Sequence, residues 1–292
     1  MPEEGQKAVL PRHATLELTY NCNHACPFCY CEWLSHAELY DKELSIEEWC
    51  GLVRTFAENG VKEFTFSGGE PLLKKGVFDL IAYAASLPQK PRLSLFSNGT
   101  LVDDPVLDFL QKHRVNFFTS IHSVHRMDFF SGARARFNRI LDLVAAAKKR
   151  GIFCGVSMTV TQKNFSSVRN VGMAALLAGA DSFQCGSVMA AGRNLQHPEL
   201  MLTEKQMAKL QSIAGGLRKI TGKTVAAVVE ERCDCYREDA EGNIGFTWKD
   251  SCGAARSFFA VGPSGMLRPC LHIPCNICHW KDFRNFKQCR PV

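Results

Sequence analysis

Three cysteines near the N-terminus, Cys22, Cys26 and Cys29, lie in the run CNHACPFC with C-x3-C-x2-C spacing. Three closely spaced thiolates can hold three irons of a [4Fe–4S] cube, whose usual complement is four cysteines. The fourth iron would then be open to a small molecule, as radical chemistry on a bound cofactor requires. A structural zinc site is the alternative, because His24 or Cys31 could complete a set of four ligands.

The other cysteines are unevenly distributed. Of 14 in total, most fall within 22–31 and 233–289, and those between them, Cys50, Cys154 and Cys185, read as small buried hydrophobes. The start of the chain has no apolar signal-peptide region, and no run of about 18 apolar residues follows. We therefore expect a cytoplasmic protein without a membrane partner. In the reducing cytosol, clustered cysteines more often bind metals or take part in catalysis than form disulfides.

The composition describes an ordinary globular protein. Of 292 residues, 46% are hydrophobic and 22% are charged, which excludes a disordered chain. The net charge is 35 − 29 = +6 and forms no clustered basic stripe, so a nucleic-acid partner is not expected.

Strand-like and helix-like segments alternate along the chain. Ser45 with Glu48 forms a capping box before the first helix, and Thr203 caps the last one. The predicted strands are 14–20, 61–66, 92–96, 116–121, 152–160 and 181–188. The predicted helices are 46–58, 76–87, 104–113, 134–150, 166–178 and 204–221. This order predicts a parallel sheet, and six units rather than eight predict an open, partial (β/α)6 TIM-like barrel.

The domain organisation follows from where this pattern stops. We expect an N-terminal tail at 1–12, a core at 13–222 and a small Cys-rich α+β domain at 223–292. In the core, the cysteine loop, SGGEP (67–71) and SNGT (97–100) each follow a strand directly. Ligands bind at the C-terminal ends of parallel strands, so these loops are predicted to converge on one rim.

Together, the cysteine triplet, the GGE-type motif, the SNGT turn and the β/α order resemble the radical SAM superfamily over about residues 13–222. The resemblance implies a [4Fe–4S] cluster on Cys22, Cys26 and Cys29 that binds S-adenosylmethionine (SAM). The reduced cluster would cleave SAM to a 5′-deoxyadenosyl radical that abstracts hydrogen from a substrate. A reductant such as flavodoxin or ferredoxin would supply the electron.

The resemblance also assigns roles to the loops. Gly68 and Gly69 would let the backbone approach SAM closely, and Glu70 would place negative charge beside its amino group. Ser97 and Asn98 would face the ribose or carboxylate of SAM. An ordinary Asn-Gly turn is the alternative for Asn98.

Further candidates lie at strand ends. Where related enzymes often have Ser-x-Asp, this chain has Ser120-Ile121-His122. This departure puts His122 in the cavity by position, to bind substrate or shuttle a proton, with a structural histidine as the alternative. Arg136 would pair with the SAM carboxylate unless it is a surface arginine. Phe28 and Met158 would line the adenine, and a Gly-Arg pair at 192–193 resembles one in peptide-modifying members.

The C-terminal part carries a second resemblance. Cys252-Gly253 followed by Gly265-x4-Cys270 is similar to the start of a SPASM or twitch domain, with hairpin strands at 258–261 and 266–268. Such domains hold auxiliary [4Fe–4S] clusters. Cys252 and Cys270 are the firmest predicted ligands, and the other places are open to Cys275, Cys278 and Cys289.

The C-terminal pattern departs from a full SPASM domain, whose cysteine run is longer. Three explanations of the shorter run stay open: a single auxiliary cluster, a compressed cysteine array, or a truncated chain. A zinc knuckle of Cys270, Cys275, Cys278 and His272 or His279 is the alternative without a cluster. Thiols at Cys233 and Cys235 are weak catalytic candidates, as donors of a hydrogen atom to a substrate radical.

The leading functional hypothesis is maturation of a ribosomally made peptide by a crosslink, a thioether or an epimerisation. Only about a dozen residues precede the first predicted strand, so a separate leader-peptide-binding protein would recruit the substrate. A sulfatase-maturing type and a haem- or cofactor-pathway enzyme are the enzyme alternatives. A structural iron–sulfur or zinc protein is the alternative without catalysis.

Overall fold

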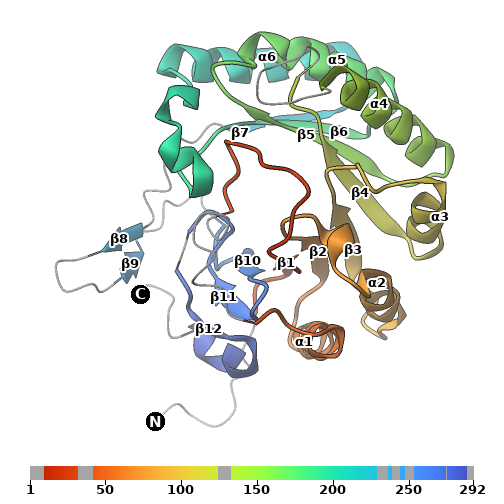
Figure 1. The fold of residues 1–292 in the computed structure, drawn as a ribbon, viewed down its shortest axis with the longest axis vertical. Coiled ribbons are helices and arrows are strands. Elements are labelled where there is room, and N and C mark those ends of the chain that lie inside the picture. Colours follow the sequence, from red (N-terminus) through yellow and green to blue (C-terminus); the bar gives the residue numbers. More distant parts are fainter. Residues whose placement is uncertain are drawn as a thin grey trace. The chain divides into compact units, whose positions relative to one another are not determined.

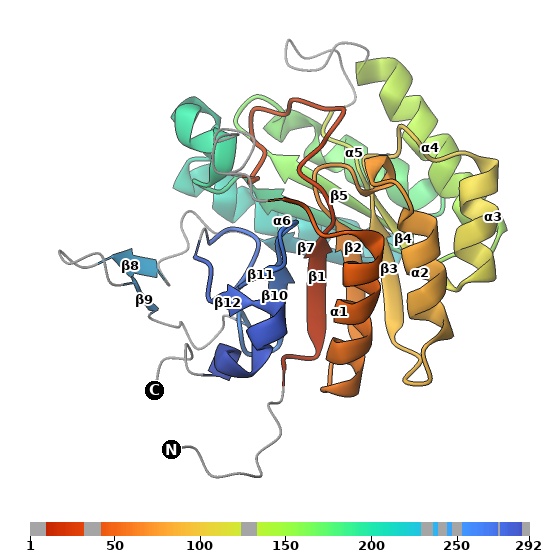
Figure 2. The same ribbon diagram turned by 60° about the horizontal axis from the view of Figure 1, so that its bottom comes forward.

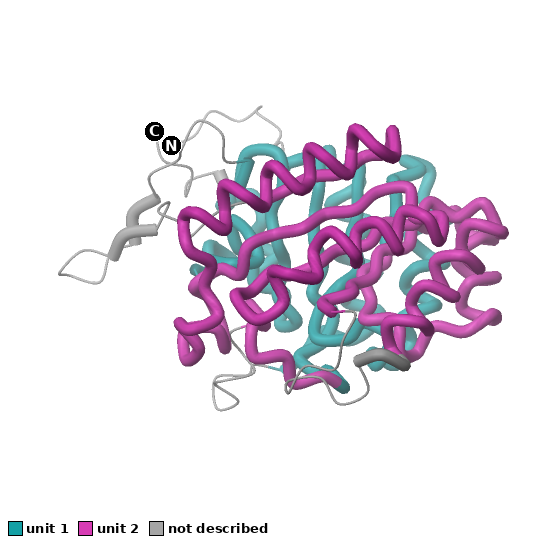
Figure 3. Tube along the Cα trace, turned by 90° about the horizontal axis from the view of Figure 1, so that it is seen from above, with its two compact units in different colours: residues 1–23, 36–94, 233–292 teal, residues 24–35, 95–232 magenta. Residues whose placement is uncertain are grey.

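The computed structural model describes residues 10–31, 42–123, 133–228, 236–238, 244–246, 253–273 and 275–287. The chain forms two compact units (Figure 3). Unit 1 comprises Met1–Asn23, His36–Ser94 and Cys233–Val292, and unit 2 comprises His24–Ser35 and Leu95–Arg232. The boundary thus crosses the cysteine loop, between its first and second cysteines. The predicted domain limits at 12 and 222 stay a prediction.

The sheet of unit 1 is built around the first strand. β1 (His13–Glu17) lies between β2 (Glu63–Ser67) and β10 (Phe258–Val261) and is parallel to both. β11 (Met266–Arg268) and β12 (Cys278–His279) continue from β10 in antiparallel order. β3 (Arg92–Phe96) follows β2 in the sheet order and contains the unit boundary. The predicted C-terminal hairpin is therefore confirmed, and it joins the sheet beside β1.

Two helices of unit 1, α1 (Ile46–Glu58) and α2 (Val77–Ser86), lie against β1–β3 on the same side (Figure 2). The predicted capping box of Ser45 and Glu48 starts α1. Short 3-10 helices, η3 (Pro71–Leu73) and η7 (Trp280–Lys287), complete the unit. In the core, the Phe56 ring lies 5.6 Å from Phe259 and 5.9 Å from Phe283, so α1, β10 and η7 share one packed interior.

The sheet of unit 2 is parallel, in chain order: β4 (Val115–Ser120), β5 (Cys154–Val160), β6 (Ser182–Ser187) and β7 (Thr224–Val228). Its helices are α3 (Asp104–Lys112), α4 (Ala133–Lys149), α5 (Val168–Leu177) and α6 (Glu204–Thr221). Helices α4–α6 lie along one face of β5–β7 (Figure 1). Three 3-10 helices lie in the loops: η4 (Phe165–Ser167), η5 (Gly192–Gln196) and η6 (Pro198–Leu200).

The predicted order of parallel strands and helices is confirmed, with two differences. The first strand ends at Glu17 rather than at residue 20, since the segment after it turns toward the loop that follows β2. A seventh parallel strand, β7, was missed because the short TVAAV begins only two residues after the C-cap Gly222 of α6. A separate antiparallel pair joins β8 (Tyr236–Glu238) to β9 (Ile244–Phe246). None of the helices in the described part of the chain is both long and apolar enough to cross a membrane.

Candidate cofactor site at the cysteine loop

In unit 1, the GGE loop is hydrogen-bonded to the residues just before the first cysteine. The Gly69 amide donates to the Thr19 carbonyl at 2.9 Å, and the Glu70 amide donates to the Asn21 carbonyl at 2.8 Å. A Cβ on Gly69 would lie 2.1 Å from the Asn21 oxygen, and Gly68 has φ +146°. Only glycine allows this approach. Two motifs more than forty residues apart are therefore held together by backbone contacts.

The Glu70 carboxylate is 1% exposed and turned toward its own loop. Its Oε1 accepts a hydrogen bond from the Leu72 amide at 3.2 Å and caps η3. The carboxyl group of Glu70 is therefore held within the GGE loop by its own backbone. Its interaction with a cationic amino group stays a prediction.

In unit 2, Cys29 has the properties of a metal-binding thiol. A hydrogen bond from Cys31 is the largest influence on it; burial opposes this, but the positive charge of Arg193 adds to it, and the pKa of Cys29 falls to about 7. The Cys29 carbonyl accepts a hydrogen bond from the Arg193 amide at 3.0 Å. Gly192 has φ +55°, and a Cβ there would lie 2.5 Å from the Tyr30 carbonyl carbon. The thiolate, which is the form that binds iron, is thus accessible at neutral pH.

Phe28 lies in a small apolar cluster of unit 2. It packs with Val188 and Leu200, and its ring centroid lies 4.8 Å from that of His122 in an edge-on arrangement. The structure therefore brings together two predicted site residues, Phe28 and His122, that are far apart in the sequence.

Hydrogen bonds and nearby charges fix the state of His122. Its Nδ1 accepts a hydrogen bond from the Thr159 amide at 3.2 Å, and Asn164 Nδ2 donates to its carbonyl at 2.9 Å. Burial, followed by the charges of Arg136 and His24, lowers the pKa of His122 to about 4. The ring is therefore neutral at pH 7 and carries its proton on Nε2.

The predicted Ser97 and Asn98 build a turn at the end of β3. Ser97 Oγ accepts from the Gly99 amide at 3.1 Å. Asn98 Oδ1 accepts from the Thr100 amide at 2.9 Å and from the Thr100 hydroxyl at 2.6 Å. The turn chemistry of Asn-Gly is thus present, and the contact with SAM stays a prediction.

Two other predicted residues lie on opposite faces of the sheet. Ser120 is paired with Ser157, so the two side chains share a face. Met158 follows Ser157 directly, is 1% exposed and pairs with Cys185 on the buried face. The structure does not bring Met158 to the face that carries Ser120.

The C-terminal cysteines are only partly described. Cys270 and Cys275 are buried, and Cys278 is half-buried on β12. The predicted candidates Cys233, Cys235, Cys252 and Cys289 lie outside the described residues. Within the described ranges, no three His, Cys, Asp or Glu side chains are gathered as a metal site. Both predicted sets of cluster ligands stay predictions.

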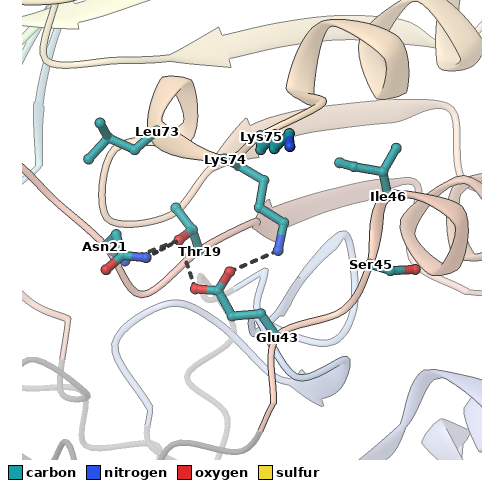
Figure 4. Close-up of a pocket in the computed structure, with 8 residues that line it drawn as sticks. All are labelled: Thr19, Asn21, Glu43, Ser45, Ile46, Leu73, Lys74 and Lys75. Atoms are coloured by element: carbon teal, nitrogen blue, oxygen red, sulfur yellow. Dashed lines mark hydrogen bonds and ion pairs between the residues drawn. The ribbon is translucent and has the colours of Figure 1, made fainter.

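One set of contacts beside the cysteine loop was not predicted from the sequence. Glu43 bonds with Thr19, Tyr20 and Lys74, on the wall of a cavity of about 350 Å³ (Figure 4). The lining residues are Thr19, Asn21, Glu43, Ser45, Ile46, Leu73, Lys74 and Lys75. The partners are 23 to 31 residues apart, so no local pattern could have predicted them.

Residues 16–171 match a family model described as "Radical SAM superfamily". The "Sporulation killing factor maturation protein SkfB" of Bacillus subtilis (strain 168) is 32% identical over 188 residues, covering 63% of this chain and 44% of SkfB. The "PqqA peptide cyclase" of Granulibacter bethesdensis is 24% identical over 266 residues, covering 89% of this chain and 67% of that relative.

A crystal structure of Streptococcus suis SuiB bound to the precursor peptide SuiA has a TM-score of 0.69 at 15% identity. The match covers 92% of this chain and 62% of SuiB. The likeness shows a shared fold, and together with the parallel β/α order it confirms the predicted fold class, a partial (β/α)6 barrel followed by a cysteine-rich α+β part. The chain spans less than two thirds of SkfB and SuiB.

Proposed function

Since the chain belongs to the radical SAM superfamily, as the match over residues 16–171 shows, we propose that it cleaves SAM and abstracts a hydrogen atom from a peptide substrate. The predicted family is thereby confirmed, and the enzyme activity is part of the proposal. The observation that carries the proposal is the backbone contact of Gly69 and Glu70 with Thr19 and Asn21, which joins the SAM-type motif to the cysteine loop.

The donor set fits a [4Fe–4S] cluster. Three thiols lie in one loop, and the pKa of Cys29 is about 7. We propose that Cys22, Cys26 and Cys29 hold the cluster. When bound and reduced by a donor such as flavodoxin or ferredoxin, the cluster supplies the electron that cleaves SAM to methionine and a 5′-deoxyadenosyl radical. The proposed SAM-binding residues are Phe28, Gly68, Gly69, Glu70, Ser97, Asn98, Ser120 and Arg136.

His122 is proposed to donate a hydrogen bond rather than to shuttle protons. Its Nδ1 is used by the Thr159 amide, and its pKa of about 4 keeps the ring neutral at pH 7. The ring's one proton is then on Nε2, so toward a ligand the ring can act only as a donor. A neutral donor at this strand end suits a hydroxyl or a carbonyl oxygen of SAM or of the substrate.

The exposed face of the unit 2 sheet supports a peptide as the substrate. Strands β4–β7 contain no charged residue. Several side chains on this face are polar and uncharged, and they are partly or fully exposed beside the apolar Phe118, Ala226 and Val228: Ser120, Ser157, Thr159, Ser182 and Gln184. Hydroxyl and carboxamide groups match peptide amides, whereas a tetrapyrrole with several carboxylates would require cationic partners. Among the relatives, the PqqA peptide cyclase is named for a peptide, and SkfB is named as a maturation protein.

An auxiliary [4Fe–4S] cluster in the C-terminal part belongs to the same proposal. Cys270, two residues after β11, and Cys275 are buried, and Cys278 begins β12. We propose Cys270 as a ligand, with Cys252, Cys275, Cys278 and Cys289 as the candidates for the remaining places.

The test is deuterium transfer under anaerobic conditions. Reconstituted protein is mixed with dithionite, SAM and perdeuterated peptides encoded by short reading frames beside its gene. We expect 5′-deoxyadenosine that has gained deuterium from one peptide, and none from a variant with Cys22, Cys26 and Cys29 changed to Ala. Formation of 5′-deoxyadenosine without peptide deuterium would overturn the substrate class. Absence of 5′-deoxyadenosine in the wild type would overturn the activity.

A further inference from the structure

A largely buried ion pair lies beside the cysteine loop in unit 1. Lys74 Nζ is 2.8 Å from Glu43 Oε2, and the two side chains are 13% and 23% exposed. Lys74 Nζ also donates to the Leu44 carbonyl at 2.8 Å. Lys74 follows η3 directly, and η3 follows the GGE motif, so one end of this pair is attached to the GGE loop (Figure 4).

The other end of the pair is attached to the segment before Cys22. Glu43 Oε1 accepts a hydrogen bond from the Thr19 hydroxyl at 2.7 Å and from the Tyr20 amide at 2.8 Å. Burial, the largest single influence, would raise the pKa of Glu43, but the bonds from Lys74, Thr19 and Tyr20 together lower it. One carboxylate, ionised at neutral pH, therefore bonds to both loops.

Thr19 extends this network to the residue next to Cys22. Its hydroxyl donates to Glu43 and accepts from the Asn21 amide at 3.1 Å and from Asn21 Nδ2 at 3.3 Å. A hydroxyl has one proton and two lone pairs, so all its capacity is used. On the other side of the turn, the Thr19 carbonyl accepts from Gly69. The turn is thus held by backbone bonds from one direction and by side chains from the other.

We propose that Glu43 and Lys74 are positioning residues, which fix the path of the chain into Cys22 relative to the GGE loop. This inference rests on the proposed function, because it gives the network a purpose only if Cys22 binds a cluster and the GGE loop binds SAM. Neither residue touches the reacting atoms. Partners of this kind, one step behind the ligands, typically contribute 10–100-fold to metal affinity or activity.

The variants to compare are Glu43→Gln, Lys74→Met and the conservative Lys74→Arg. Glu43→Gln keeps the shape but leaves Lys74 without its counter-charge. The matched control is Arg92→Met, which removes the exposed ion pair of Glu63 and Arg92 in the same unit at 3.4 Å. The readouts are iron per protein, the Kd for SAM, and the fraction of reduced cluster whose electron paramagnetic resonance (EPR) spectrum changes on addition of SAM.

We expect Glu43→Gln and Lys74→Met to lower the SAM-responsive EPR fraction and to raise the Kd for SAM by roughly 10-fold or more, with normal circular dichroism. Lys74→Arg should recover much of this loss, and Arg92→Met should match the wild type.

The inference is overturned if both variants keep the wild-type EPR response and SAM affinity within twofold, even when their melting temperature falls. The network would then stabilise only the fold. Failure of the proposed function looks different, because the wild type itself would bind no cluster and release no 5′-deoxyadenosine.

Discussion

Glu17, at the end of β1, and Arg268, at the end of β11, form an ion pair in the interior of unit 1. Their side chains are 0% and 8% exposed. Burial lowers the pKa of Arg268 to about 10, although the nearby Cys270 opposes this, so the guanidinium remains charged at pH 7. The pair fastens the C-terminal hairpin, two residues before Cys270, to the strand that leads into the cysteine loop.

The first prediction concerns this pair. Arg268→Met leaves a buried carboxylate without its counter-charge, which should lower the free energy of unfolding by about 3–5 kcal/mol. The double variant Glu17→Met with Arg268→Met should recover most of that loss, because no buried charge is left. Urea unfolding of the cluster-free protein measures both. A loss of under 1 kcal/mol in the single variant would contradict the prediction.

The second prediction concerns the contact between the GGE loop and the cysteine loop. In Gly69→Ala the Cβ would lie 2.1 Å from the Asn21 oxygen, so the loops must separate. We expect the rate of SAM cleavage to fall roughly 10–100-fold, measured as 5′-deoxyadenosine formed per cluster.

A second glycine provides the control. A Cβ on Gly216, within α6, meets nothing within 4 Å. Gly216→Ala should therefore stabilise the protein by about 0.5–1 kcal/mol and leave SAM cleavage unchanged. Equal rates in the two variants would show that the close approach of Gly69 does not matter for the reaction.

The third prediction is a pH dependence of stability. His24 and His122 both have a pKa near 4, chiefly because of burial and secondly because of Arg136, against 6.5 when unperturbed. The unfolded chain binds these protons at higher pH than the folded one. Stability should therefore be full above about pH 6.5 and should fall as the pH drops toward 4.

Replacement of the two rings tests this assignment. The variant His24→Gln with His122→Gln should have a flatter profile of unfolding free energy between pH 4 and 6.5 than the wild type. Urea titrations at several pH values provide the measurement. An identical slope would mean that other groups cause the acid sensitivity.

The elements that sequence reasoning located well are those with local signals. The capping boxes of Ser45 with Glu48 and of Thr203 with Gln206 mark the helix starts that the structure has. The bounds of β3 agree with the predicted 92–96, where alternation ends in an Asn-Gly turn. Capping and turn chemistry depend on residues within four positions, so a sequence displays them.

The features that sequence reasoning missed depend on distant partners. β7 is five residues long and is a strand because it pairs with β6. Glu43 precedes a helix cap and would pass for a solvated charge, yet its partners are Thr19 and Lys74. The face of Met158 could have been read from the alternation of β5, because its neighbours Val156 and Val160 are apolar.

The fourth prediction concerns Gly192. Its φ is +55°, and a Cβ would collide with the Tyr30 carbonyl group. This backbone conformation places the Arg193 amide where it donates a hydrogen bond to the Cys29 carbonyl. Gly192→Ala should therefore loosen Cys29 and shorten the lifetime of the reconstituted cluster in air, measured by loss of its visible absorption. Gly216→Ala again serves as the control, and equal lifetimes would contradict the role assigned to the Gly-Arg pair.

The last prediction separates the two sets of cysteines. A variant with Cys22, Cys26 and Cys29 changed to Ala should retain about four irons per protein after anaerobic reconstitution, because each cube contributes about four. Adding Cys270→Ala should remove them, whereas adding Cys185→Ala, on the buried face of β6, should not. About eight retained irons would indicate two auxiliary clusters. One zinc and no iron per protein would indicate a zinc knuckle in place of the auxiliary cluster. No metal at all would indicate that the C-terminal cysteines are structural thiols.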